Sequence, residues 1–110
     1  MKLSELITAL GYEVVTRPDE DRDVVSGYTS DLLSDVMGNA EEGSVFITVQ
    51  AHRNSVAVAA QLDFPAIILC NSRPVAADMT EAAKSEGVAL LRTADSQFVA
   101  SYKVYSALNR

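Results

Sequence analysis

The fold is decided by one stretch of the sequence, Asp21-Arg22-Asp23-Val24-Val25-Ser26-Gly27-Tyr28-Thr29-Ser30-Asp31-Leu32-Leu33-Ser34-Asp35-Val36-Met37. Within it, the adjacent β-branched residues Val24 and Val25 predict a strand. Gly27 then predicts a tight turn, or a place where the backbone comes close to another segment. Ser30 or Asp31 is suited to cap a helix, and the apolar spacing of the following residues extends that helix to about Asn39. The stretch therefore predicts a strand that passes through a turn into a helix.

Strand and helix patterns alternate in the rest of the chain. Short apolar runs that predict strands are found at 13–16, 44–50, 65–70 and 88–92. Helical spacing of apolar residues is found at 3–10, about 56–61, about 76–86 and about 97–108. The connections are short and contain Gly, Pro, Asn and Ser, which favours a mainly parallel sheet with helices on both faces. The sequence thus predicts an α/β three-layer domain.

Length and charge limit the class of protein. A chain of 110 residues predicts a single domain over 1–110. The net charge is −6, from nine basic and fifteen acidic residues. Because the basic residues are scattered, they predict no nucleic-acid partner, although one bound nucleotide is compatible with them. No signal-peptide pattern and no apolar run of about 20 residues is present, so we expect a cytoplasmic protein with no membrane partner.

Polar residues gather after the predicted strands, in the connections where open parallel sheets bind ligands. A tentative ligand site is predicted from Tyr28, Ser30, Asp31, His52, Arg53, Asn54, Asn71, Ser72, Arg73 and Thr93. Arg53 and Arg73 would balance the charge of a bound anion, and backbone N–H groups at helix starts would donate hydrogen bonds to the anion. The alternative explanation is that these residues cap helices and form polar loops. Further cap positions are expected at Asn54 or Ser55 and at Asp95 or Ser96.

Few residues suggest catalysis or metal binding. His52 is the only histidine, and no nucleophile motif, phosphate loop or second metal-spaced histidine accompanies it. We expect its side chain to hold a loop by hydrogen bonds. The single Cys70 excludes an internal disulfide and a cysteine-built metal site within one chain. We therefore predict no catalytic residue, no metal and no cofactor.

Two surface features complete the sequence-based expectations. The carboxylates between Asp19 and Asp23 predict a solvated acidic loop. Phe98, Tyr102 and Tyr105 share one face of the last helix. We expect that face to pack on the sheet, with an exposed surface for a partner as the alternative.

On the opening stretch the chain resembles the DRTGG domain family. The name motif of the family here reads Asp21-Arg22-Asp23-Val24-Val25-Ser26-Gly27, in which the middle differs and one of the paired glycines is Gly27. The segments from Gly27 to Met37 and from Val45 to Asn54 are similar to stand-alone members, and the likeness covers essentially the whole chain. The resemblance implies a layered α/β fold similar to the N-terminal domain of HPr kinase/phosphorylase.

The resemblance also implies a role. Family members occur as regulatory inserts beside CBS domains in pyrophosphatases and ahead of the catalytic domain in some phosphotransacetylases, often at a dimer interface. We therefore expect a non-catalytic regulatory or interaction module that works as a homodimer. The alternative is a sensor of a small ligand, an adenine nucleotide or another anion. Two further hypotheses are an accessory protein of an unidentified enzyme partner, such as a hydrogenase, and a small enzyme that uses His52 as acid or base.

Overall fold

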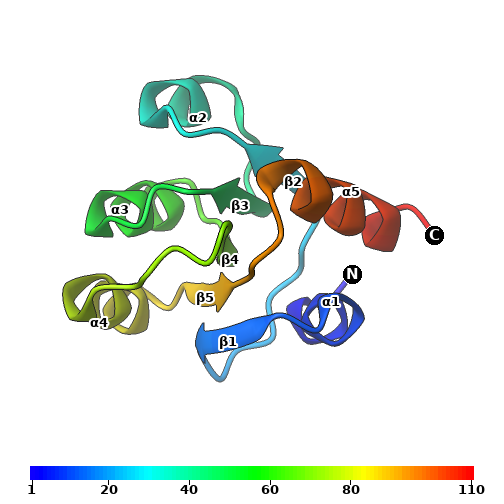
Figure 1. Cartoon of the computed structure of the whole chain (residues 1–110), viewed down its shortest axis with the longest axis horizontal. Helices are drawn as coiled ribbons and strands as arrows, with labels where there is room; N and C mark the ends of the chain where they lie inside the picture. The colour runs from blue at the N-terminus through cyan, green and yellow to red at the C-terminus, as the bar shows by residue number, and fades with distance from the viewer.

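A five-stranded sheet lies between two layers of helices in the computed structural model, which describes residues 1–110 (Figure 1). The strands are β1 (Glu13–Thr16), β2 (Ser26–Thr29), β3 (Ser44–Thr48), β4 (Ala66–Leu69) and β5 (Ala89–Arg92). The helices are α1 (Leu3–Leu10), α2 (Leu33–Asn39), α3 (Arg53–Gln61), α4 (Ala77–Glu86) and α5 (Gln97–Leu108). The strand order is β1-β5-β4-β3-β2, in which β2 to β5 are parallel and β1 pairs antiparallel with β5.

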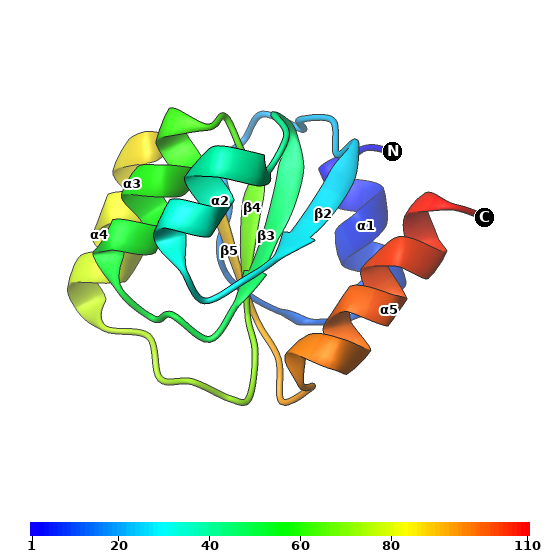
Figure 2. The ribbon, with the colours of Figure 1, turned by 90° about the horizontal axis from the view of Figure 1, so that it is seen from above.

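Both faces of the sheet are covered. Helices α1 and α5 lie over one face, and α2, α3 and α4 lie over the other (Figure 2). Successive residues of a strand point to opposite faces, so in β3 Val45 and Ile47 belong to one core and Phe46 to the other. All five residues of β3 are buried, which explains its continuous apolar run. The predicted three-layer α/β fold with a mainly parallel sheet is confirmed.

The strand of the opening stretch lies further along the chain than predicted. Val24 and Val25 precede β2, and Gly27 lies inside the strand, paired in register with Val45. The turn predicted at Gly27 is therefore wrong, but the predicted close approach is confirmed. A Cβ atom at Gly27 would lie 3.3 Å from Cγ1 of Val104, so the glycine allows α5 to pack closely on β2.

The helix α2 begins later than predicted. Its N-cap residue is Leu32, which has no capping side chain, so the predicted caps Ser30 and Asp31 are wrong. The hydroxyl of Ser30 instead accepts a hydrogen bond from the backbone N–H of Leu32 at 3.1 Å and tightens the turn into the helix. The carboxylate of Asp31 is bound elsewhere, as described below.

The helix α3 begins at Arg53, three residues before the predicted start. Asn54 and Ser55 therefore lie within the helix and do not cap it. The hydroxyl of Ser55 is buried and donates to the carbonyl of Gln50 at 2.8 Å. Ser96 is a confirmed cap, because its hydroxyl accepts a hydrogen bond at 3.2 Å from the backbone N–H three residues into α5.

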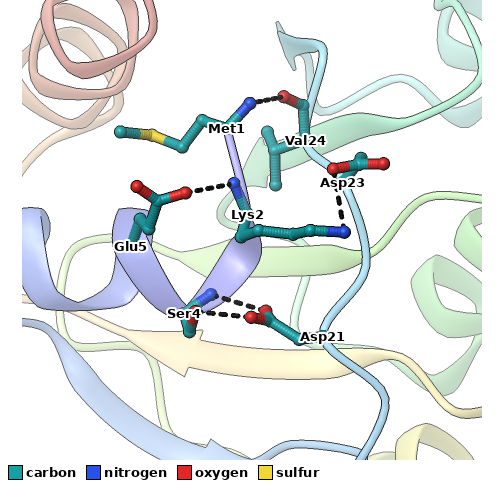
Figure 3. A network of polar contacts seen from close by, with 7 residues as sticks. All are labelled: Met1, Lys2, Ser4, Glu5, Asp21, Asp23 and Val24. Carbon is teal, nitrogen blue, oxygen red and sulfur yellow. Dashed lines mark hydrogen bonds and ion pairs between the residues drawn. The ribbon is translucent and has the colours of Figure 1, made fainter.

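The start of α1 is held by the acidic segment that precedes β2 (Figure 3). The two carboxylate oxygens of Asp21 accept hydrogen bonds from the backbone N–H and the hydroxyl of Ser4, at 2.9 and 2.6 Å. These bonds lower the pKa of Asp21. Lys2 forms an ion pair with Asp23 at 3.2 Å. The acidic loop is exposed, as predicted, but two of its carboxylates also anchor a helix.

Arg22 lies between these two carboxylates and binds the turn before β4. Its guanidinium donates to the carbonyls of Asp63 and Phe64 at 2.9 and 3.1 Å, and it pairs with the carboxylate of Asp63 at 2.7 Å. The charged residues of the Asp21–Asp23 motif thus fasten α1 and this turn to the amino end of the sheet. None of the five helices has the length and apolar character that crossing a membrane requires.

Candidate functional site

The carboxyl ends of β2, β3, β4 and β5 meet along one side of the sheet, which we call the carboxyl edge. Open parallel sheets bind ligands at this side. Nine of the ten predicted site residues lie there, in the connections that follow these strands or in the first turn of α3. The exception is Tyr28, which lies within β2 and whose hydroxyl donates to Asp35 of α2 at 3.0 Å.

Asp31 joins three elements of the carboxyl edge. One carboxylate oxygen accepts hydrogen bonds from the hydroxyl of Thr48 at 3.0 Å and from the backbone N–H of Val49 at 3.1 Å. The other oxygen accepts from the side chain of Gln97 in α5 at 3.0 Å. Partial burial alone would raise the pKa of Asp31, but these hydrogen bonds outweigh it and the pKa is lowered. The carboxylate therefore stays charged and fastens the end of β2 to β3 and α5.

The connection after β4 is held in an unusual backbone conformation. Asn71 and Ser72 have positive φ angles of 59° and 52°, which non-glycine residues seldom adopt. Their backbone N–H groups donate to the carbonyls of Asp95 and Thr93, both at 2.9 Å. The guanidinium of Arg92 donates to the carbonyls of Ser72 and Arg73, at 2.8 and 2.7 Å. The structure thus brings Asn71, Ser72 and Thr93 together through the backbone.

A second polar cluster beside this connection contains Asp95. One oxygen of its carboxylate accepts a hydrogen bond from the hydroxyl of Tyr12 at 2.7 Å and from the ammonium of Lys103 at 2.8 Å. Lys103 also lies 5.7 Å from the centre of the Tyr12 ring. Lys103 and Tyr12 lower the pKa of Asp95, and burial together with the Asp95 carboxylate raises that of Tyr12. The cluster fastens the end of α1 to α5.

Sequence reasoning missed this cluster as a unit. The sequence predicts Asp95 only as a possible helix cap, and Tyr12 lies 83 positions away from it. No local pattern joins residues so far apart; only the order of the strands brings them together. Cys70 is fully buried near them, and burial raises the pKa of its thiol to about 11. The thiol is therefore in its unreactive, protonated form at neutral pH.

The cations of the predicted site remain free. Arg53 and Arg73 take part in none of the five ion pairs of the structure. His52 is exposed at the N-cap of α3, where its backbone carbonyl, and not its ring, accepts a hydrogen bond from Ser55. The predicted role of the His52 side chain in holding the loop is therefore wrong. These three side chains are accessible to a ligand.

One hollow opens at the carboxyl edge. Its volume is about 350 Å³, and it is lined by Gly11, Tyr12, Glu13, Ser72, Arg92, Thr93 and Ala94. It brings together two of the predicted site residues, Ser72 and Thr93. The volume is at the lower end of the roughly 300–1,000 Å³ range of small-molecule sites. No group of three or more His, Cys, Asp and Glu side chains is placed to hold a metal ion.

The aromatic side chains of α5 face solvent. Phe98 is 85% exposed, and Tyr102 and Tyr105 are each 69% exposed. The prediction that this face packs on the sheet is wrong, because α5 contacts the sheet through the smaller residues Ala100, Val104 and Ala107. We call Phe98, Tyr102 and Tyr105 the aromatic stripe.

A second hollow lies between α5 and β2, beside the aromatic stripe. Its volume is about 360 Å³, and it is lined by Val25, Ser26, Gly27, Thr29, Ile47, Ser101, Val104, Tyr105, Leu108 and Asn109. Within it the hydroxyls of Thr29 and Ser101 are hydrogen-bonded to each other at 2.6 Å. The hollow therefore combines apolar side chains with hydroxyl groups and contains no charged residue.

Over 96% of its length, the chain is similar in architecture to a solved structure of the CBS and DRTGG domains of the regulatory region of Clostridium perfringens pyrophosphatase, complexed with the activator diadenosine tetraphosphate. The TM-score is 0.73 and the sequence identity 18%, so the similarity is one of fold. This chain has a DRTGG-like fold. It spans 46% of the solved chain of that regulatory region, less than half of its length. No family model and no curated protein matches the sequence.

Proposed function

We propose that this chain is a non-catalytic regulatory module that acts by contact with other proteins and works as a homodimer. The observation that carries the proposal is the aromatic stripe of α5, three large rings exposed on a helix whose opposite face already packs in the core. Large exposed apolar patches often mark surfaces for association, and aromatic side chains are enriched at interfaces. A DRTGG-like fold, similar to a regulatory region, supports the same role.

The bonding of the carboxyl edge also favours a role without catalysis. A general acid or base has to exchange its proton with a substrate. The carboxylates of Asp31 and Asp95 instead receive three and two hydrogen bonds from neighbouring groups of the protein. Their lowered pKa values keep them charged at neutral pH. Both groups stabilise the ends of strands and helices, and neither is free to react.

Sedimentation equilibrium of the purified chain at micromolar concentration tests the proposal. We expect the mass of two chains, because the aromatic stripe would be covered by a partner. A single species with the mass of one chain over the whole micromolar range would contradict the homodimer. The cytoplasmic location stays a prediction from the sequence.

A second function, the sensing of an adenine nucleotide or another anion, is favoured by the free cations of the carboxyl edge. Arg53 and Arg73 are exposed and form no ion pair, and His52, which precedes Arg53 in the chain, is also exposed. An anion at this edge would also accept hydrogen bonds from the backbone N–H groups at the start of α3. The similar pyrophosphatase region was solved with a nucleotide activator.

A thermal-shift screen with AMP, ADP, ATP, diadenosine tetraphosphate and inorganic phosphate tests this second function. A ligand at 100 times its dissociation constant stabilises the fold by about 2.7 kcal/mol. For a domain of this size, that raises the melting temperature by roughly 10 °C or more. We expect Arg73→Ala and His52→Ala to weaken the shift without unfolding the chain. An equal shift in both variants would contradict the site, and no shift with any compound would contradict the sensor.

A further inference from the structure

Two faces of α5 carry apolar side chains at helical spacing. One face is buried and consists of Ala100, Val104 and Ala107. The other is the aromatic stripe, whose residues follow one another at four and then three positions, the spacing of a seam along which two helices pack. Successive residues of a helix are turned by about 100°, so the stripe lies directly opposite the buried face. Its three rings therefore point straight away from the sheet.

The stripe is on the outer side of a layer of helices. On one flank of α5, Lys103 contacts the ring of Tyr12, which follows α1. On the other flank, the hydroxyl of Ser101 is hydrogen-bonded to that of Thr29 in β2 at 2.6 Å. Helices α1 and α5 lie side by side over the same face of the sheet (Figure 2). A molecule that covers the stripe therefore has to pack on top of this layer.

The order of the rings is close to symmetrical about Tyr102. Phe98 lies four positions before it, and Tyr105 lies three positions after it. When two α5 helices pack antiparallel with a twofold axis at Tyr102, Phe98 of each copy lies opposite Tyr105 of the other, and the two Tyr102 rings meet at the axis. An interface between identical chains across a twofold axis requires such a self-complementary pattern. The stripe therefore fits a second copy of itself.

The outward face of α5 carries no charge. The chain has a net charge of −6, but no acidic residue follows Asp95. Lys103, the one basic residue within α5, lies on the flank toward α1 and is bound to Asp95 at 2.8 Å. Of the carboxylates near β2, Asp35 belongs to α2 on the opposite face of the sheet, and Asp23 is held in an ion pair at 3.2 Å. Two stripes can therefore meet without facing carboxylates.

The charges at the two ends of α5 favour the antiparallel orientation. At the N-terminal end, the carboxylate of Asp31 accepts a hydrogen bond from Gln97 and takes part in no ion pair. At the C-terminal end, Arg110 also takes part in no ion pair, and it lines a shallow hollow together with Glu5 of α1. Antiparallel packing brings the Asp31 end of each helix toward the Arg110 end of the other and opposes the two helix dipoles. Parallel packing would bring like ends together.

The stripe has the area that a dimer of moderate stability needs. A Phe or Tyr side chain buries roughly 150–250 Å². With exposed fractions of 85%, 69% and 69%, the three rings of two chains together would bury about 900 Å². The neighbouring exposed residues Val99 and Asn109 add to this area. The total lies between crystal contacts, mostly below about 800 Å², and standard interfaces of about 1,200–2,000 Å². We therefore expect a dimer that forms at micromolar concentration and dissociates on dilution.

We propose that two copies of the chain pack the aromatic stripes of antiparallel α5 helices face to face, across a twofold axis that is perpendicular to the helices and parallel to the sheets. This rests on the proposed homodimer and names the surface and the orientation that form it. The axis lies at Tyr102. Helices α1 and α5 of both copies form the centre of the dimer, and the two sheets lie outside them.

Disulfide cross-linking of single-cysteine substitutions tests the surface and its orientation. In the antiparallel dimer, position 98 of one copy lies opposite position 105 of the other, whereas the two copies of position 98 are about 10 Å apart along the helices, too far for a disulfide. We expect an equimolar mixture of Phe98→Cys and Tyr105→Cys chains to form a covalent dimer under oxidation roughly tenfold faster than either variant alone, because packing holds the two thiols together. Met37→Cys on α2 is the exposed control for random collisions, and the native Cys70 is buried.

Each other outcome has a definite meaning. Cross-linking of Phe98→Cys alone as fast as that of the mixture would overturn the antiparallel orientation. If light scattering shows that the parent is a dimer but no stripe variant cross-links faster than Met37→Cys, the surface is wrong and the homodimer stands. A parent that is monomeric at micromolar concentration would overturn both.

Tyr102→Glu tests the same surface without cysteine chemistry. The substitution places two carboxylates at the twofold axis, one from each copy, so we expect a monomer by light scattering. Because Tyr102 is 69% exposed, the circular dichroism of the variant should be unchanged. A folded Tyr102→Glu that is as dimeric as the parent would overturn the packing of the two stripes.

Discussion

Gly27 of β2 lies directly against Val104 of α5, so that a Cβ atom on Gly27 would approach Val104 Cγ1 to 3.3 Å. Val104 is buried, and this contact holds the small-residue face of α5 close to the sheet. The large rings of the same helix consequently point outward, away from the sheet. The position of the proposed dimer surface depends on this one glycine.

Gly27→Val is expected to destabilise the fold by about 1–3 kcal/mol, the usual cost of overpacking a close contact. The matched control is Gly38→Ala in α2, where no atom lies within 4 Å of the added Cβ. We expect the control to be neutral or to gain up to about 1 kcal/mol, because alanine favours a helix over glycine. Urea unfolding of both variants and the parent checks this. Equal stability of Gly27→Val and the parent would mean that α5 tolerates displacement.

Asp31→Ala is expected to lower the free energy of unfolding by about 1–3 kcal/mol, because it leaves the hydroxyl of Thr48 and the backbone N–H of Val49 without their acceptor. Asp19→Ala is the control, since Asp19 is exposed and forms no ion pair. We expect the control to stay within about 0.5 kcal/mol of the parent. The account of the carboxyl edge fails if the two substitutions have the same effect.

The lowered pKa values of Asp31 and Asp95 predict how stability depends on pH. An aspartate in the unfolded chain has a pKa of about 3.9. Because the folded-state values are lower, the stabilisation is fully present above that pH and is lost as the pH falls through the folded-state values. Urea unfolding at neutral pH and near pH 3 measures the loss. Asp31→Asn should lose less free energy of unfolding between the two pH values than the parent. An equal loss would mean that Asp31 does not contribute to the pH dependence.

Cys70 is expected to react slowly with a thiol reagent in the folded protein. Burial raises its pKa from 9.0 to about 11, which lowers the thiolate fraction about a hundredfold, and the side chain is also inaccessible. Modification in denaturant should be fast and complete. Rapid stoichiometric modification of the native chain, followed by absorbance, would show that β4 opens easily or that the thiol is exposed.

The sequence was sufficient to predict the mainly parallel sheet and the helical layers on its two faces. The continuous apolar run of β3 and the Ser96 cap are local signals, and both are found where they were predicted. The cluster of Tyr12, Asp95 and Lys103 was not predictable, because strand order alone brings α1 against α5. The predicted helix caps Ser30 and Asp31 were wrong. The carboxylate of Asp31 accepts a hydrogen bond from the backbone N–H of Val49, which follows β3, and not from the first turn of α2.

The aromatic stripe shows why helical periodicity could mislead. Both faces of α5 carry apolar residues at helical spacing, so the pattern did not determine which face is buried. The large aromatic side chains favoured the prediction that their face of the helix is buried. The glycine in β2 instead selects the face with Ala100, Val104 and Ala107, because only small side chains fit the short distance between helix and sheet.

Small-angle X-ray scattering tests the central claim, the homodimer, most directly. The Cα radius of gyration of one chain is 12.1 Å. A compact particle of two chains, about 220 residues, has a radius of gyration of about 17 Å. We predict a value of at least about 17 Å at micromolar concentration, falling toward that of one chain in Tyr102→Glu. A parent value near that of one chain would contradict the account.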